Sequence, residues 1–393
     1  MSDPWLTIVG IGEDGVAGLS PASQAALDAA EVILAPPRHL SLIPVGSAER
    51  IAWPVPFTGG LDILDGLRGR TTVVLASGDP FWFGAGSVIA RRYASAEWRA
   101  LPGPSCFSLA AATLGWPLED TVCHGLHAAP FARLRRDLAP GLRLLATLRD
   151  GTAVADLCAY LAGLGFGSSE VTILERLGHP DARRTTARAD ALTGDFTHPL
   201  VAAIAVTDGP ALPRATGLPD DTFDHDGQIT KRPIRAVTLS TLAPKPHEHL
   251  WDIGGGSGSI ALEWLLAHPT TTATSVEPRP DRAARIRANA DTLGVAHRLA
   301  VIEGSAPDAL TGLTKPDAIF IGGGLSQPLL DAALSQGTRL VANAVTLEGE
   351  ALLSTAAATH GGTLMRLDIS TSAPLGPKRG WKAAYPVVQW SVP

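Results

Sequence analysis

The residues with the clearest chemical meaning are a glycine-rich turn at 254–258 and an acid, Glu277, further along the chain. A largely apolar segment, residues 250–253, precedes the turn, and the glycines of the turn alternate with other residues as G-x-G-x-G. Glycine allows bare backbone N–H groups at the start of a helix to approach a ligand closely. An acid roughly 20 residues later, at the end of the next strand, can bind ribose hydroxyls. The spacing therefore predicts a nucleoside-binding βαβ unit.

This glycine spacing differs from the G-x-G-x-x-G of dinucleotide sites. The alternating form resembles motif I of class I methyltransferases, which bind S-adenosylmethionine (SAM). The resemblance implies cofactor contacts at Gly254, Gly255, Gly256, Ser257, Gly258 and Glu277. A nicotinamide cofactor and a tight turn without any ligand are the alternative interpretations.

Composition limits the classes of protein that this chain can be. Its 393 residues suffice for two or three domains, and a formal net charge of -6 argues against a partner bound through nucleic-acid phosphates. The three cysteines have no CxxC or metal-ligand spacing, so we expect no metal site and a reducing compartment. Without a basic signal-peptide start or an apolar run of about 20 residues, we expect a cytoplasmic protein with no membrane partner.

The pattern of Pro, Gly and Asp at 209–228 breaks both helix and strand, and it predicts a linker between domains at 1–208 and 229–393. Helical and strand patterns alternate in the second domain, which predicts a parallel α/β sheet with helices on both faces. Its last two strands, near 363–369 and 386–392, are expected to close the sheet as an antiparallel hairpin, as in class I methyltransferases.

Three small-residue turns occur in this order in the first domain, at 9–12, at 75–80 with Gly84, and at 102–105. Together they resemble the tetrapyrrole methylase family, the class III SAM-dependent fold. The resemblance implies an α/β domain of two lobes, about 1–103 and 104–208, with SAM in the trough between them. The implied cofactor contacts are Gly10, Gly12, Ser77, Gly78, Asp79, Ser105 and Cys106. Ordinary strand-to-helix turns are the alternative.

A further segment narrows the resemblance of the first domain. Residues 114–120, followed by Gly-Leu-His at 125–127, resemble the C5-methylase branch of the family, although two alanines replace its usual glycine and arginine. The match assigns a catalytic role to His127, which could donate a hydrogen bond to a substrate carboxylate or act as an acid or base. Structural packing of this histidine is the alternative. Many family members have proline where this chain has Glu13, so no cofactor contact is assigned there.

The second domain resembles the decarboxylating C15-methylases at segments 229–235, 303–308 and 319–324. This resemblance adds Thr230 and Ala306 to the implied cofactor contacts. It also suggests the loop 322–326 as the floor of a pocket in which a carboxylate loses carbon dioxide, with a simple helix-entry turn as the alternative.

A class III module followed by a Rossmann-like class I module resembles fused corrin methylases. That implies methylation of an anionic tetrapyrrole at carbons 5 and 15, decarboxylation of its ring C acetate at carbon 12, and two SAM sites, in cobalamin biosynthesis. These families also imply a homo-oligomer. Basic residues should bind the substrate carboxylates, and the candidates are Arg38, His39, Arg133, Arg135, Arg136, Lys231, Arg232, Arg235, Lys378 and Arg379. Alternatives are a cobalt-bearing substrate, RNA methylation, and a non-catalytic protein that binds SAM and a corrinoid.

Overall fold

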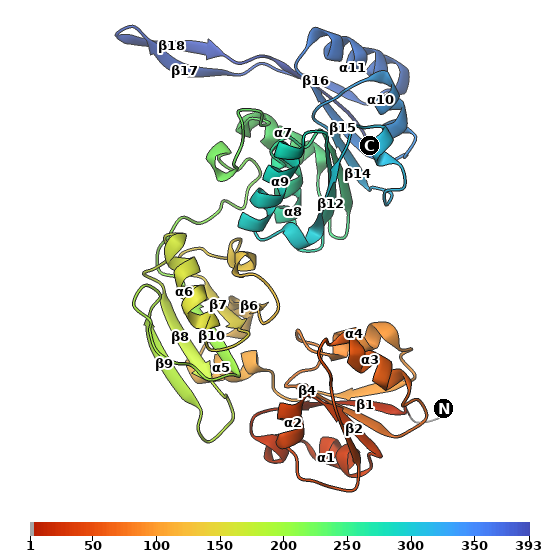
Figure 1. Ribbon diagram of the computed structural model, residues 1–393. Coiled ribbons are helices and arrows are strands. Elements are labelled where there is room, and N and C mark those ends of the chain that lie inside the picture. Colours follow the sequence, from red (N-terminus) through yellow and green to blue (C-terminus); the bar gives the residue numbers. More distant parts are fainter. Residues whose placement is uncertain (1–3) are drawn as a thin grey trace. The chain divides into compact units, whose positions relative to one another are not determined.

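The computed structural model describes residues 4–393, which form two compact units (Figure 1). The first unit runs to Phe131 and resumes over Asp137–Pro210, and the second comprises Ala132–Arg136 and Ala211–Pro393. Within residues 4–393, no helix has both the length and the apolar character needed to cross a membrane.

The first unit contains a parallel sheet with the strand order β3-β2-β4-β1-β5. Its strands are β1 (Leu6–Ile11), β2 (Val32–Ala35), β3 (Glu49–Ala52), β4 (Thr72–Ser77) and β5 (Trp98–Leu101). Its helices are α1 (Pro21–Asp28), α2 (Pro37–Ser41), α3 (Thr58–Asp65) and α4 (Gly86–Arg92). Alternate residues of the central strands enter two separate apolar clusters, because helices cover both faces of the sheet.

A second sheet in this unit has the order β6-β7-β10-β8-β9 and is mostly antiparallel. Its strands are β6 (Thr121–Gly125), β7 (Arg143–Thr147), β8 (Glu170–Glu175), β9 (Arg183–Arg188) and β10 (Leu200–Ala205). The helices α5 (Cys106–Leu114) and α6 (Ala153–Gly163) accompany it. The first unit therefore contains two α/β sheets, in line with the two-lobed fold class expected from the sequence.

The second unit is built on a seven-stranded sheet with the order β13-β12-β11-β14-β15-β19-β16. Among the described residues, β19 runs in the opposite direction to the other six strands of this sheet. The strands are β11 (His249–Ile253), β12 (Thr272–Glu277), β13 (Leu299–Glu303), β14 (Ala318–Ile321), β15 (Arg339–Ala344), β16 (Thr363–Leu367) and β19 (Val387–Val392). The helices are α7 (Arg232–Leu242), α8 (Ser259–Ala267), α9 (Pro280–Thr292), α10 (Gln327–Leu334) and α11 (Leu347–His360). The strand order reverses between β11 and β14, which is where α/β sheets bind ligands.

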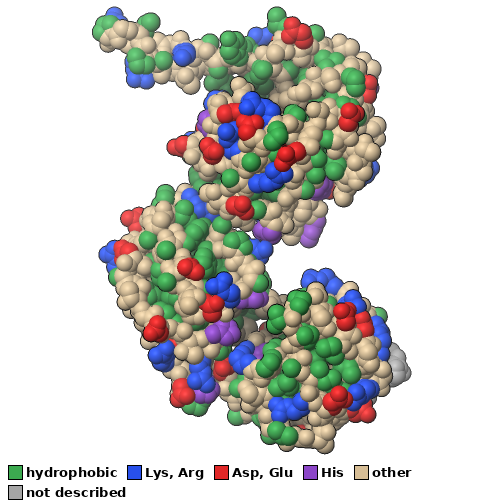
Figure 2. All heavy atoms as spheres, in the orientation of Figure 1, with side chains coloured by type: hydrophobic (Ala, Val, Ile, Leu, Met, Phe, Trp, Pro, Cys, Tyr) green, Lys and Arg blue, Asp and Glu red, His purple; other side chains and the backbone are tan. Residues whose placement is uncertain are grey.

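The end of the second unit differs from the expected hairpin. Strands β16 and β19 do pair antiparallel, but a separate two-stranded arm, β17 (Ser370–Leu375) and β18 (Lys378–Ala383), lies between them in the sequence. This arm projects from the unit and exposes hydrophobic and basic side chains (Figures 1 and 2). Leu375 is 69% exposed and Trp381 is 80% exposed, so the arm has little core of its own.

The expected linker is largely part of the second unit. Residues 211–228 lack a regular period, yet Leu212, Leu218 and Phe223 are buried in the main apolar cluster of that unit. Of the acidic residues in this segment, Asp226 pairs with Arg282 at 2.9 Å, while Asp221 and Asp224 are exposed to solvent. The boundary between the units therefore lies at 210–211.

Candidate active sites

A cavity of about 630 Å³ lies in the first unit beside the ends of β1 and β4 and the loop after β5. The three strand-end loops hold one another through their backbones. The N–H of Gly78 donates to the Ile11 carbonyl at 2.9 Å, and the N–H of Gly103 donates to the Gly78 carbonyl at 3.1 Å. The three motifs noted in the sequence are therefore adjacent in space.

Most of the residues predicted to contact a ligand in this unit line that cavity. They are Gly12, Ser77, Gly78, Asp79, Ser105, Cys106 and His127. Gly10 lies outside the lining, because it is packed between the loops: an added Cβ would lie only 1.8 Å from the Gly78 carbonyl oxygen. Gly10 thus permits close packing of the loops.

Helix α5 begins beside this cavity. The Ser105 hydroxyl caps the helix by accepting a hydrogen bond from the Ser108 N–H at 3.0 Å. The positive end of the helix can favour an anionic group on a ligand. Burial raises the pKa of the adjacent Cys106 thiol to about 11, so this cysteine is protonated and is a poor nucleophile.

A polar cluster of Glu13, Arg38, His39 and Ser77 lines the same cavity. Arg38 pairs with Glu13, and its guanidinium donates to Nε2 of His39 at 2.8 Å and to the Ser77 hydroxyl at 3.1 Å. Burial, together with the charge of Arg38, lowers the pKa of His39 to about 4. His39 is therefore neutral, which corrects its expected role as a cationic ligand of carboxylates. Glu13, to which no role was assigned, holds Arg38 in place.

His127 lies just beyond β6, on the cavity wall, and its side chain is exposed. Its Nδ1 is 3.4 Å from the Thr147 hydroxyl, at the end of β7. His198 also lines the cavity, and burial lowers its pKa below the ordinary histidine value. Sequence reasoning missed His198, because no motif surrounds it.

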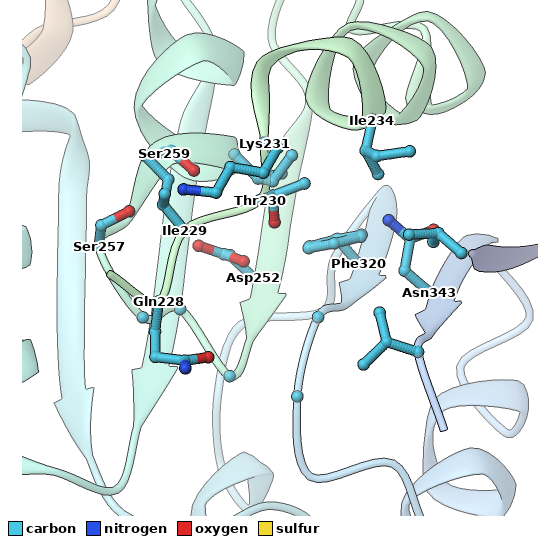
Figure 3. A pocket seen from close by; sticks show the side chains of 18 of the residues that line it. Gln228, Ile229, Thr230, Lys231, Ile234, Asp252, Ser257, Ser259, Phe320 and Asn343 are labelled. Atoms are coloured by element: carbon cyan, nitrogen blue, oxygen red, sulfur yellow. The ribbon is translucent and has the colours of Figure 1, made fainter. Parts of the chain in front are cut away.

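The second unit has a cavity of about 1300 Å³ beyond the ends of β11, β12 and β14 (Figure 3). Of the residues expected to contact a ligand, those in the lining are Thr230, Gly254, Gly255, Gly256, Ser257, Glu277 and Ala306. The loop residues Gly322, Gly323 and Gly324 line it as well. Gly258 does not; with φ +78 it precedes α8 and packs against Ile286.

The glycine-rich turn and the loop after β14 approach each other closely. Gly254 has φ +74, and an added Cβ would lie 2.7 Å from Cα of Gly323. On the other side of the turn, Glu277 accepts hydrogen bonds from the N–H of Gly256 at 2.8 Å and of Arg279 at 3.1 Å. Backbone and carboxylate together therefore define this end of the cavity.

Asp252 is a cavity residue that the sequence interpretation missed. It is 1% exposed and accepts a hydrogen bond from the Ser275 hydroxyl at 3.2 Å. Burial raises its pKa to about 7, against the opposing effect of the Ser275 hydrogen bond. The sequence did carry a signal for Asp252, namely an acid two residues before the first glycine of the turn.

Arg235 corrects another expectation, since it was a candidate for binding substrate carboxylates. Its side chain is fully buried and donates to Glu263 at 2.6 Å and to Asp220 at 3.0 Å. Glu263 also accepts hydrogen bonds from the N–H groups of Gly217 and Leu218. The pair therefore attaches the segment before α7 to α8, and it has no access to a ligand.

Some of the other basic residues that were expected to bind substrate carboxylates line a cavity, and others do not. Arg38 and Lys231 line the two cavities. Neither cavity is lined by Arg133, Arg135, Arg136, Arg232, Lys378 or Arg379. Arg282 and Lys382 line the larger cavity and were not predicted to do so.

Comparisons with known proteins match both halves of the chain. Residues 5–193 match the Tetrapyrrole (Corrin/Porphyrin) Methylases, and residues 221–393 match the Precorrin methyltransferase domain. The resemblances noted in the sequence are thereby confirmed.

Relatives match over the full length. A "Precorrin-6Y C(5,15)-methyltransferase [decarboxylating]" of Sinorhizobium sp is 49% identical over 99% of this chain and 96% of its own. The protein of the same name from Mycobacterium tuberculosis CDC 1551 is 41% identical over 98% of this chain and 99% of its own. The crystal structure of the C-terminal domain of precorrin-6Y C5,15-methyltransferase from Rhodobacter capsulatus is 52% identical, covers 46% of this chain and 98% of its own, and has a TM-score of 0.45. The chain belongs to the precorrin-6Y C(5,15)-methyltransferase (decarboxylating) family.

Proposed function

We propose that this chain methylates precorrin-6Y at carbons 5 and 15 and removes carbon dioxide from the ring C acetate at carbon 12, giving precorrin-8X. One observation carries the proposal: each unit has its own cavity, built on a different fold, at the loops that the sequence assigned to SAM. Two methylations at distant carbons of one macrocycle are consistent with two separate methyl-donor sites.

In the second unit we assign SAM to the end of the cavity formed by the glycine-rich turn. Glu277 would bind the ribose hydroxyls, while Gly254 to Gly256 bring backbone close to the ligand without side chains in the way. The Ser257 hydroxyl is buried there with no partner among the described residues, so it can bond to a ligand. When bound, SAM supplies an electrophilic methyl group.

In the first unit we assign a second SAM to the cavity at the ends of β1 and β4. Gly12, Gly78 and Asp79 form one side of it, and Ser105 with Cys106 at the start of α5 forms another. Backbone hydrogen bonds between these loops hold them in a defined shape. Gly10 and Gly258 are not among the residues that line the two cavities, so we assign them to the shape of the loops.

The protein's main task is to align an electron-rich ring carbon with the methyl group, which can contribute roughly 7–11 kcal/mol. Arg38 in the first cavity and Lys231 and Lys382 in the second are placed to bind carboxylates of the substrate. His127 is the residue we assign to hydrogen bonding or proton transfer at the first site, because it is exposed on the cavity wall.

We also infer a homo-oligomer. The arm formed by β17 and β18 exposes Leu375 and Trp381, and an isolated two-stranded hairpin is marginally stable in water. Packing against a second copy of the chain would bury these side chains. Sedimentation of the chain, compared with a Trp381→Ser variant, tests this inference, which a wild-type monomer would contradict.

The function is tested by incubating the full chain with precorrin-6Y and methyl-labelled SAM and determining the product by mass spectrometry. A gain of two methyl groups with loss of one carbon dioxide is expected. Separation of the chain between Pro210 and Ala211, where the units divide, should then assign each step. Unchanged substrate would contradict the assignment. A parallel reaction with the cobalt-bearing intermediate tests the substrate of a Salmonella typhimurium relative, "Cobalt-precorrin-6B C(15)-methyltransferase (decarboxylating)", which is 31% identical over 40% of this chain.

A further inference from the structure

Asn343 presents a carboxamide to an apolar part of the cavity in the second unit. It lies near the end of β15 and is partly exposed there, although residues 340–342 are buried. Figure 3 shows its side chain beside Phe320 and Ile234, across the cavity from Ser257 of the glycine-rich turn. The same cavity is also lined by the apolar residues Leu329, Val345, Leu367, Ile369 and Val387.

The orientation of this carboxamide is fixed by a polar network from three elements. Asn343 faces Gln389 directly across the β15–β19 pair, and Nε2 of Gln389 donates to Oδ1 of Asn343 at 2.9 Å. Nδ2 of Asn343 donates to the hydroxyl of Thr238, on α7, at 2.9 Å. Thr241, one turn further along α7, donates to Oε1 of Gln389 at 3.0 Å. Each carboxamide therefore has one defined orientation.

This network is costly to maintain in a sheet core. Thr238 is fully buried and Gln389 is 1% exposed, and buried polar groups weaken a fold unless every member is paired. A carboxamide has two N–H groups, and among the described residues only one of those on Asn343 has a protein acceptor. The second N–H is available to a ligand in the cavity.

We propose that Asn343 binds the substrate carboxylate that departs as carbon dioxide, and that Gln389, Thr238 and Thr241 position its carboxamide. The proposal rests on the function proposed above. Its chemical reason is the charge of the donor. The carboxylate loses its negative charge as carbon dioxide leaves, so a strong cationic partner would stabilise the starting state more than the transition state. A neutral N–H in an apolar wall orients the carboxylate without that penalty.

The step balances with groups that are present. The bond between the acetate methylene carbon and the carboxylate carbon breaks, and carbon dioxide leaves. The electron pair of that bond passes into the conjugated macrocycle. A proton from water then adds to the methylene carbon and completes the new methyl group.

The test is the ratio of carbon dioxide loss to carbon-15 methylation, measured by mass spectrometry on the full chain with precorrin-6Y and methyl-labelled SAM. Asn343→Ala removes the donor, and Asn343→Asp keeps the shape but places a negative charge beside the carboxylate. Gln389→Leu removes the hydrogen bond to Oδ1 of Asn343, so the carboxamide is no longer held in one orientation. Gln336→Leu is the matched control, because Gln336 is in the same unit but does not line the cavity.

We expect Asn343→Asp to lower this ratio at least about tenfold and to accumulate a dimethylated product that keeps the carboxylate. Asn343→Ala and Gln389→Leu should lower it less, and Gln336→Leu should leave it unchanged. An unchanged ratio in Asn343→Asp, or a parallel fall of methylation and carbon dioxide loss in all three variants, would overturn the assignment. Failure of the proposed function is a different result, since the wild-type chain would then form no dimethylated product.

Discussion

The backbone N–H of Gly256 donates a hydrogen bond to Oε2 of Glu277 at 2.8 Å, so the acid at the end of β12 holds the glycine-rich turn that follows β11. Its other oxygen accepts from the N–H of Arg279 at 3.1 Å. Glu277 thus has a structural partner on each oxygen, and lone pairs remain for ribose hydroxyls. The hydrogen bonds to Glu277 therefore hold the turn in a defined conformation.

Replacing Glu277 with Gln should weaken SAM binding to the second unit about tenfold or more, because hydrogen bonds to a charged group contribute about 1.5–3 kcal/mol. Methylation at carbon 15 should fall, while methylation at carbon 5 continues. Calorimetric titration with SAM and product mass measure the two effects. Glu303→Gln is the control, since Glu303 lies opposite Glu277 in the register of strands β12 and β13 but does not line the cavity. Equal affinity in the Glu277 and Glu303 variants would contradict the assigned contact.

Gly254→Ala should abolish most carbon-15 methylation, because the new Cβ meets Cα of Gly323 at 2.7 Å and the residue has φ +74. Gly337→Ala is a matched control with a similar φ of +60 and open space around the added Cβ. The control should lose only about 1 kcal/mol of stability and keep its activity. Similar activity losses in both variants, measured as initial rates of methyl transfer, would show that backbone strain rather than contact is responsible.

The carboxyl of Asp252 should make stability depend on pH. Burial raises its pKa to about 7 from an ordinary 3.8, so the folded chain favours the protonated form. The contribution of protonated Asp252 to the free energy of unfolding is complete below about pH 4 and is lost as the pH rises through about 7. Asp252→Asn stays neutral, so its melting temperature relative to wild type should rise by several degrees between pH 5 and pH 8. A constant difference across this range, in scans of the full chain, would contradict the prediction.

Arg235→Met should destabilise the second unit by about 3–5 kcal/mol, because it leaves Glu263 buried without its cationic partner. The double variant with Glu263→Gln should recover part of this loss. Hydrogen exchange of peptides from residues 211–393, followed in the full chain, measures the local stability. Arg366→Met is the control, since Arg366 is half exposed and its ion pairs should contribute about 0–1 kcal/mol. Equal effects in the two single variants would be the contrary result.

His127→Ala should lower methylation at carbon 5 at least about tenfold without changing methylation at carbon 15. The two products differ by one methyl group and are separated by mass. His179→Ala is the matched control in the same unit, because His179 does not line the cavity. If carbon-5 methylation proceeds normally without His127, this residue only packs against Thr147.

Strand β11 and helix α8 could be predicted from the sequence, because a largely apolar segment is followed by the G-x-G-x-G pattern that is typical of a turn between a strand and a helix. It did not indicate β3, a short strand whose residues are half or fully exposed. The arm at 370–383 was missed for the same reason, since its side chains are exposed and follow no hydrophobic alternation. Short exposed strands leave little periodic signal.

The missed site residues have a different explanation. Asn343 contacts Gln389 and Thr238, which lie 46 and 105 residues away, so no local pattern connects them. Arg235 was expected at a substrate surface, but it lies on the inner side of α7 and meets Glu263, 28 residues on. Long-range pairing of polar side chains is decided by the fold, and local spacing does not report it.

Each of the two cavities is lined by residues of one unit alone. Neither unit therefore depends on the other for the walls of its site. The joined chain does fix the ratio of the two units, because a single message encodes both of them in equal numbers. Under the function proposed above, a cell that expresses this gene makes the two sites in equal numbers.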